Sequence, residues 1–293
     1  AGKISLPYCL TFLFCAFTVY SDLETMGNSA FLSKKINTEL DRLEEVTNIP
    51  QMDTSTDKLE TSHYDITLDH VSFGYDKRQV IHDISLNIPE HTTCAIVGPS
   101  GSGKTTLIRA ILGILPPGGT VTEGKILFQG KNILELDETS LQKLRGTEIA
   151  MIFQDVGASL DPIRIVESQY RESILAHRKM AKADCRSLEK EMLAKMHLTD
   201  PERVMVSYPF ELSGGMKQRV GIAMSMTARP RLLLADEPTS ALDVTIQAEV
   251  VREMKKLREQ YETAIILVTH NMGVASYISD KIGVMCKGEL VEF

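Results

Sequence analysis

One short glycine-rich segment constrains the fold of this chain more than any other feature. Residues 98–105 have the sequence Gly-Pro-Ser-Gly-Ser-Gly-Lys-Thr and match the pattern G-x-x-x-x-G-K-[ST]. The apolar run Thr93–Val97 before it predicts a buried strand, and residues 106–112 after it predict a helix. A strand, a glycine-rich loop and a helix in this order form the context in which the pattern binds phosphate. The segment therefore predicts a phosphate site within an α/β fold.

The residue types of this loop suit a nucleoside triphosphate. Glycines allow the backbone to curl so that successive N–H groups point at phosphate oxygens, and the following helix adds its positive N-terminal end. We expect Lys104 to reach the β- and γ-phosphates and the Thr105 hydroxyl to ligate Mg²⁺. The alternative is a glycine-rich turn without a ligand. The residues expected to contact the nucleotide here are Gly98, Ser100, Gly101, Ser102, Gly103, Lys104, Thr105 and Thr106.

Composition narrows the class of protein. The 293 residues are enough for one large domain or two modest ones, and their apolar content is that of a globular protein. The net charge of −7 disfavours broad nucleic-acid binding, which usually requires a basic face. The five cysteines are scattered and form no C-x-x-C pair, so we expect free thiols in a reducing compartment rather than disulfides or a zinc site.

The first 62 residues differ in character from the remainder. Residues 10–19 are almost entirely apolar, whereas a helix that spans a membrane needs about 20 such residues. We expect residues 1–46 to comprise the end of a truncated transmembrane helix and then an amphipathic helix, and a signal peptide is the alternative for the apolar part. Residues 47–62 are polar and predict a linker. The main domain should then occupy residues 63–293.

Strand and helix patterns in the main domain predict an α/β fold with two additions. The predicted strands are 65–73, 80–88, 93–97, 125–129, 131–136, 149–153, 231–235 and 264–269, with an amphipathic helix at 246–260. Residues from about 158 to 228 contain no strand pattern and predict a helical insert that breaks near 207–209. We expect a P-loop core with a parallel sheet, an antiparallel β subdomain and a helical subdomain.

Four polar residues end or follow predicted strands. Asp236 ends one such strand and Glu237 follows it, so pairing beside the phosphate loop would place Asp236 near Mg²⁺ and let Glu237 polarise a water molecule. His270 and Gln154 follow two other strands. In a shared sheet, His270 would contact the γ-phosphate and Gln154 would reach Mg²⁺ or the water. Taken singly, such residues are more often solvated or capping groups.

A second anion site is predicted at the start of a later helix. Residues 212–218 are Leu-Ser-Gly-Gly-Met-Lys-Gln, which places Ser213 at a helix N-cap and Gly214 and Gly215 in the first turn. The free N–H groups and the dipole at such a helix end attract anions. An ordinary N-cap is the alternative.

Together these motifs resemble the nucleotide-binding domain of ATP-binding cassette (ABC) transporters. From about residue 66 to residue 293 they follow that family's order: Tyr75, the loop at 98–105, Gln154, the signature Leu-Ser-Gly-Gly at 212–215, Asp236-Glu237, the segment Ser-Ala-Leu-Asp at 240–243, and His270. The resemblance implies ATP and Mg²⁺ as ligands. It also implies two domains that dimerise head to tail, with each ATP between one domain's phosphate loop and the other domain's signature.

The resemblance assigns a role to each motif residue. Tyr75 would stack on adenine, the signature residues Ser213, Gly214 and Gly215 would bind ATP of the opposite domain, and Asp243 would lie at the dimer seam. The implied catalytic residues are Glu237, His270, Gln154 and Lys104. The implied metal ligands are Thr105, Gln154 and Asp236.

Two subfamilies of the ABC group are represented along the chain. Residues from about 108 onward resemble the ATPases of bacterial oligopeptide and dipeptide importers, through the motifs at 151–154, 159–162, 211–219 and 235–243. Residues 1–105 resemble an exporter half-transporter instead. The implied function is an ATP-hydrolysing motor that powers peptide import, and the alternative is a fragment of an exporter. A soluble ABC ATPase that acts on DNA or ribosomes, and a nucleotide sensor without turnover, fit less well.

The implied partners follow from this function. They are a second ABC ATPase domain and transmembrane permease subunits or domains, with a periplasmic binding protein acting indirectly and no nucleic acid. The implied location is the cytoplasmic face of the inner membrane. Because the membrane and periplasmic partners choose the cargo, the sequence does not specify the transported substrate.

Overall fold

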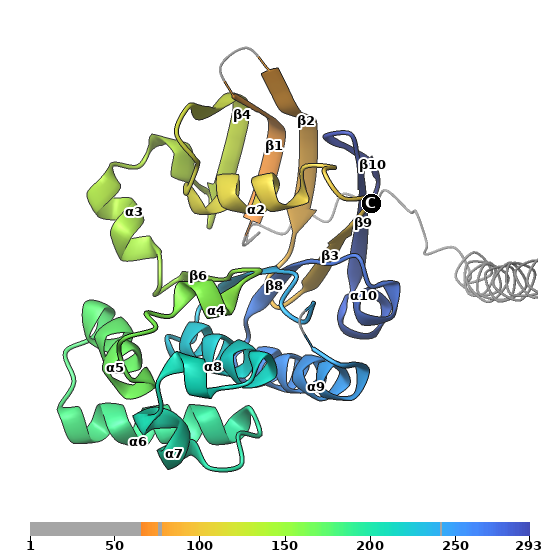
Figure 1. Cartoon of the computed structure of the whole chain (residues 1–293). Helices are drawn as coiled ribbons and strands as arrows, with labels where there is room; N and C mark the ends of the chain where they lie inside the picture. The colour runs from red at the N-terminus through yellow and green to blue at the C-terminus, as the bar shows by residue number, and fades with distance from the viewer. Residues whose placement is uncertain (1–65, 76–77, 241) are drawn as a thin grey trace, which may run out of the picture. The chain divides into compact units, whose positions relative to one another are not determined.

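A computed structural model describes residues 66–75, 78–240 and 242–293 of the chain (Figure 1). All of them belong to one of the two units into which the chain divides, Thr61–Phe293. The apolar segment, amphipathic helix and linker predicted for residues 1–62 lie outside the described residues. In the described ranges, no helix has the length and apolar character needed to cross a membrane.

The centre of this unit is a six-stranded sheet with the order β10-β9-β3-β8-β7-β6. Its strands are β3 (Thr93–Val97), β6 (Ile149–Ile152), β7 (Leu232–Asp236), β8 (Ala264–Val268), β9 (Lys281–Cys286) and β10 (Glu289–Glu292). All neighbours pair in parallel except β9 and β10. Every residue of β3, β6, β7 and β8 is buried, which explains why these strands appear in the sequence as continuous apolar runs.

A second, antiparallel sheet has the order β2-β1-β4-β5. It consists of β1 (Ile66–Tyr75), β2 (Arg78–Ile88), β4 (Gly119–Phe128) and β5 (Lys131–Asn132). Helix α2 (Lys104–Leu112) lies between the two sheets in Figure 1. Its buried side chains Leu107, Ile108 and Ile111 share one apolar cluster with both sheets.

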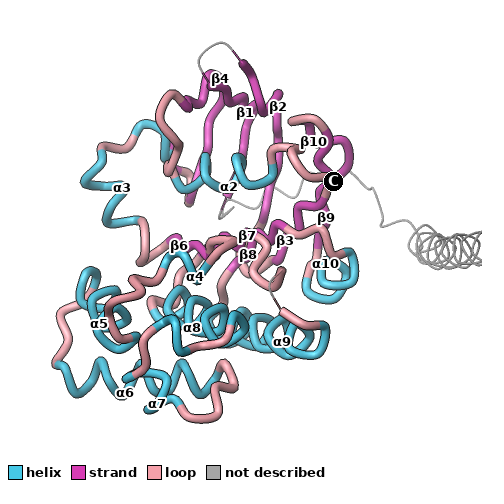
Figure 2. The backbone as a smooth tube through the Cα atoms, in the orientation of Figure 1, coloured by secondary structure: helices cyan, strands magenta, loops and turns pink. Residues whose placement is uncertain are grey.

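Helices cover the opposite face of the six-stranded sheet (Figure 2). They are α4 (Val156–Ser159), α5 (Val166–His177), α6 (Lys182–Lys195), α7 (Pro201–Val206), α8 (Gly214–Thr227) and α9 (Val244–Tyr261). Leu233 and Ala235 of β7 join the cluster on this side, whereas Leu232 and Leu234 join the other. This alternation follows from the two-residue period of a strand and divides the core into two layers. The expected combination of parallel sheet, antiparallel sheet and helical segment is therefore confirmed.

Several predicted elements differ from the structure. The strand predicted at 131–136 ends at Asn132, because the Asn132 side chain accepts a hydrogen bond from the N–H of Leu134 and caps the 3₁₀ helix Ile133–Glu135. The prediction omitted α3 (Glu138–Leu144), α10 (Met272–Ile278), β9 and β10. A second 3₁₀ turn, Pro209–Glu211, occupies the predicted break before α8.

The helical layer contains a buried carboxyl group. The side chain of Glu189 on α6 is fully buried, and neither of its oxygens has a hydrogen-bond partner among the described residues. Burial, and to a lesser extent the nearby Glu167, raise its pKa to about 7, against the opposite effect of Arg171 and Arg186. In the folded chain this carboxyl group is thus largely neutral at pH 6.

The free energy of unfolding should therefore depend on pH through Glu189. The folded pKa of about 7 exceeds the ordinary value of 4.5, so the folded state binds more protons and loses stability as pH rises through this window. Glu189→Gln should remove a decrease of up to ~3 kcal/mol between pH 5 and pH 8, measured by urea unfolding. Glu249→Gln, at an exposed position, is the control. An unchanged pH dependence in Glu189→Gln would contradict the assignment.

Candidate nucleotide site

The phosphate loop joins β3 to α2 and depends on three glycines. Gly98, Gly101 and Gly103 have φ angles of 149°, 79° and 97°, a region that side chains other than glycine rarely adopt. At Gly98 a Cβ atom would lie 2.1 Å from the backbone oxygen of Met285. The loop can therefore turn sharply between strand and helix only with glycine at its first position.

Lys104 begins α2 and folds back over the loop. Its Nζ donates hydrogen bonds to the backbone oxygens of Gly98, at 2.7 Å, and Pro99, at 2.8 Å. Burial lowers the pKa of Lys104, and the neighbouring carboxylates of Glu237 and Asp236 oppose this shift. The ammonium group thus lies above the loop, where phosphate oxygens can take the place of the carbonyl partners.

Thr105 and Asp236 provide oxygen donors suited to a magnesium ion. The Thr105 hydroxyl donates to Oδ1 of Asp236 at 3.0 Å, and Asp236 is 1% exposed at the end of β7. Burial raises the pKa of Asp236 and the Thr105 hydrogen bond lowers it, so a nearby cation would favour the carboxylate. Among the described residues no three His, Cys, Asp or Glu side chains cluster as a metal site. This donor set fits Mg²⁺ that takes one or two ligands from the protein and further ligands from phosphates, as is usual for this ion.

Glu237 and His270 face each other across neighbouring strands. The parallel register pairs Asp236 of β7 with Val268 of β8, and the Glu237 N–H donates to the Val268 oxygen at 2.9 Å. His270 Nδ1 lies 3.1 Å from Oε1 of Glu237. Glu237 has a φ of 46°, in the left-handed region that residues other than glycine rarely adopt. The two side chains are thus adjacent at the carboxyl edge of the sheet, beside the loop.

Gln154 and Tyr75 are positioned by two other strands, β6 and β1. Gln154 is exposed two residues after the end of β6, which lies next to β7 in the sheet. Tyr75 is half-buried at the end of β1, and its ring meets that of Phe73 edge-on with centroids 5.0 Å apart. Contacts of Gln154 with a metal and of Tyr75 with adenine remain predictions.

The signature residues lie on a different part of the surface. Ser213 caps α8 by accepting a hydrogen bond from the N–H of Met216 at 3.3 Å, and Ser213 and Gly214 are exposed. A Cβ atom at Gly215 would lie 3.2 Å from Cδ2 of Leu242, so the start of α8 packs near the start of α9. In the described part of the chain, no hydrogen bond joins these residues to the phosphate loop.

Asp243 caps α9 by accepting a hydrogen bond from the Ile246 N–H at 3.0 Å. It is exposed, and its place at a seam between two domains stays a prediction. The structure therefore gathers Lys104, Thr105, Asp236, Glu237 and His270, and it leaves Ser213, Gly214 and Asp243 exposed on the surface.

The hairpin of β9 and β10 supports the phosphate loop and was missed from the sequence. The Gly288 N–H donates to the Ser102 oxygen at 3.1 Å, and the Gly288 oxygen accepts from the His82 N–H of β2 at 2.9 Å. Lys287 and Gly288 both have positive φ, as in a two-residue hairpin turn. The glycine between two apolar stretches, 282–286 and 290–291, is the signal that could have located this hairpin.

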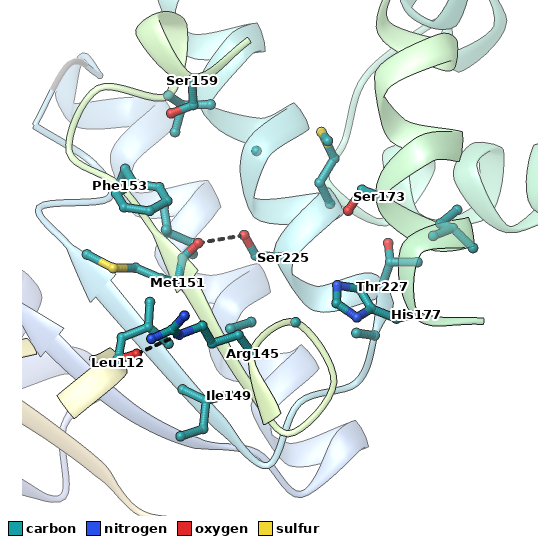
Figure 3. Close-up of a pocket in the computed structure, with 18 of the residues that line it drawn as sticks. Leu112, Arg145, Ile149, Met151, Phe153, Ser159, Ser173, His177, Ser225 and Thr227 are labelled. Carbon is teal, nitrogen blue, oxygen red and sulfur yellow. Dashed lines mark hydrogen bonds between the residues drawn. The ribbon is translucent and has the colours of Figure 1, made fainter. Parts of the chain in front are cut away.

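An apolar pocket of about 330 Å³ opens on the side of β6 and α8 (Figure 3). Met151 of β6, Phe153 just after it and Ser159 of α4 line it, and Ser225 donates a hydrogen bond to the Met151 oxygen at 3.1 Å. Phe153 is 37% exposed. Because Phe153 precedes Gln154, this pocket adjoins the segment that leads from the nucleotide site into the helices.

Comparison with known proteins gives consistent results. A sequence model described as ABC transporter matches residues 81–240. The oligopeptide transport ATP-binding protein OppD of Bacillus subtilis is 42% identical over 229 residues, which are 78% of this chain and 64% of that protein. The dipeptide transport ATP-binding protein DppD of Lactococcus lactis is 42% identical over 227 residues, 76% of this chain and 65% of that protein. The chain thus spans less than two thirds of the length of these two relatives.

A solved structure agrees with the fold. It is the dimeric post-hydrolysis state of the ATP-binding cassette MJ0796 bound to ADP and Pi, with a TM-score of 0.70 and 30% sequence identity. The match covers 78% of this chain and 97% of that chain. Because the family model covers more than half of the sequence and the fold agrees, this chain belongs to the ABC transporter family.

Proposed function

We propose that the chain is the ATP-binding and ATP-hydrolysing motor subunit of an ABC transporter that imports oligopeptides or dipeptides. The observation that carries this proposal is the group formed by Lys104, Thr105, Asp236, Glu237 and His270 at one edge of the sheet. The names of the relatives, which are transport proteins for oligopeptides and dipeptides, support the cargo class.

The proposed mechanism uses positioning and charge. The loop N–H groups and Lys104 bind the β- and γ-phosphates, which neutralises negative charge as the terminal phosphoryl group leaves. Mg²⁺, held by Thr105 and Asp236 and assisted by Gln154, supplies further charge neutralisation when bound. Glu237 orients the attacking water and accepts its proton. His270 holds the Glu237 carboxylate through its 3.1 Å contact and approaches the γ-phosphate.

A second cassette would complete the site. The exposed N-terminus of α8 at Ser213 and Gly214 offers free N–H groups, and Asp243 lies nearby on the surface. Head-to-tail dimerisation would bring these residues to the γ-phosphate on the other copy. The dimeric state of the similar solved cassette supports this arrangement. Tyr75 would cover the adenine.

The membrane partner would dock in the apolar pocket beside Phe153. The pocket has room for part of a helix, and Ile114 and Phe153 expose apolar surface at it. A movement of Gln154 on nucleotide binding would then be transmitted to that partner through the adjacent Phe153. In this proposal the chain works at the cytoplasmic face of the membrane, and a periplasmic binding protein would act only through the permease.

Removal of the proposed base should separate binding from hydrolysis. Glu237→Gln keeps the shape of the side chain but cannot accept a proton, so ATP turnover should fall at least ~100-fold while ATP affinity is retained. Phosphate release and equilibrium binding of a fluorescent ATP analogue measure the two effects. Full turnover in this variant would refute the assigned role.

Removal of the loop lysine should weaken binding itself. Lys104→Ala deletes the ammonium group expected at the β- and γ-phosphates, so ATP affinity should fall roughly tenfold or more. Lys125→Ala, at an exposed position on β4, is the matched control. Equal ATP affinity in the Lys104→Ala and Lys125→Ala chains would count against the phosphate-loop assignment.

The membrane partner can be identified by capture from native membranes in mild detergent, followed by mass spectrometry. We expect permease subunits and a second ATPase, and Phe153→Asp should reduce their recovery roughly tenfold because it places a charge in an apolar contact. Val291→Asp, 61% exposed on β10, is the control. Recovery only of longer copies of this chain with membrane helices would favour the exporter alternative.

A further inference from the structure

Gln247, in the second turn of α9, connects the segments that follow Glu237 and His270. Its Nε2 donates a hydrogen bond to the Thr239 hydroxyl at 2.8 Å, and its Oε1 accepts one from Nδ2 of Asn271 at 3.0 Å. Thr239 is two residues after Glu237, and Asn271 directly follows His270. One half-buried amide therefore spans the two segments that bear the proposed catalytic pair.

Both partners of Gln247 are held firmly by further contacts. Thr239 is 3% exposed, and its backbone oxygen accepts a hydrogen bond from the Leu242 N–H at 3.2 Å. Asn271 donates its N–H to the Thr269 hydroxyl at 3.1 Å. Its side-chain oxygen also accepts from the Gly273 N–H at 2.9 Å and thereby caps α10. A displacement of Thr239 would therefore be passed on to Asn271 rather than absorbed by a loose side chain.

His270 needs such an anchor. Its side chain is 65% exposed, and the hydrogen bond to Glu237 is the one side-chain hydrogen bond that the described residues provide for it. The orientation of an exposed imidazole depends on its backbone, which Asn271 fixes on one side. Gln247 also lines the same cavity, of about 200 Å³, as Glu237 and His270.

We propose that Gln247 is a positioning residue that makes the orientation of His270 toward Glu237 depend on the segment of residues 239–243. That segment ends at Asp243, where the second copy is expected to meet this one. A displacement of the segment by contact with the second copy would be transmitted through Thr239, Gln247 and Asn271 to His270. This inference rests on the proposed function and adds to it a route by which dimer contact sets hydrolysis.

Gln247→Leu should remove the connection while keeping the fold. Leucine has a similar size, and the polar cavity allows water to bind the Thr239 hydroxyl and the Asn271 amide. In the full chain, kcat for ATP hydrolysis should fall about 10- to 100-fold, because His270 is no longer held in its orientation toward Glu237. KM and ATP affinity should change less than about twofold. Gln260→Leu, on the exposed surface of the same helix, should retain the unmodified kcat.

Thr239→Val tests the same connection at the Thr239 side. It also replaces Gln247→Leu if that variant yields too little folded protein. It should lower kcat with the same unchanged KM. Because both changes remove the hydrogen bond from Gln247 Nε2 to the Thr239 hydroxyl, the double variant should be no slower than the slower single variant. A double variant whose losses multiply would overturn the inference.

Glu237→Gln distinguishes failure of this inference from failure of the proposed function. Unchanged kcat in Gln247→Leu, together with lost turnover in Glu237→Gln, would overturn the inference and leave the function standing. A loss in Gln247→Leu that appears as a raised KM would also overturn it. Full turnover by Glu237→Gln would overturn the proposed function and the inference with it.

Discussion

Parallel pairing of β3, β8 and β7 is the constraint on which the site depends. The register aligns Ile96 with Val268 and Val268 with Asp236, so all three strands end at the same edge of the sheet. The phosphate loop, the carboxylates and the histidine are then neighbours although about 170 residues separate the first from the last. These strands are buried on both faces, so a shift of register would not move a polar face into the core. Burial alone therefore does not fix the register. The hydrogen bonds at the strand ends, such as that from the Glu237 N–H to the Val268 oxygen, fix the alignment.

The signature residues and the apolar pocket lie apart from that edge. The signature at the start of α8 packs against the start of α9, through Gly215 and Leu242. The pocket beside Phe153 lies at β6, the edge strand of the six-stranded sheet on the side opposite to β9 and β10. The proposed function therefore assigns three separate surfaces to the chain: one to the nucleotide, one to a second cassette and one to a membrane partner. The segment 237–247 and the residue Gln154 link these surfaces along the chain.

The sequence predicts the buried strands and the loop well, because each depends on local composition. Continuous apolar runs mark β3, β7 and β8, and the glycine pattern marks the loop, so these local patterns alone assign Lys104, Asp236 and Glu237 to one site. Elements that depend on side-chain hydrogen bonds are less visible. Asn132 ends a predicted strand early, and Asn271 starts a short helix that no apolar periodicity announces. The bridge made by Gln247 is invisible in the sequence, since its two partners lie 8 and 24 residues away along the chain.

The position of the β9–β10 hairpin has a consequence for biosynthesis. Strand β3 is paired on one side by β8 and on the other by β9, and the turn at Gly288 joins the phosphate loop to β2. The ribosome delivers the loop at residue 98 almost 200 residues before this support at residue 288. A nascent chain that has not reached β8 therefore carries an apolar strand with both edges unpaired, together with a phosphate loop that lacks its hydrogen bond from Gly288. Folding of the nucleotide site must wait for nearly the whole unit to emerge, and until then the exposed edges of β3 are surfaces that a chaperone would have to cover.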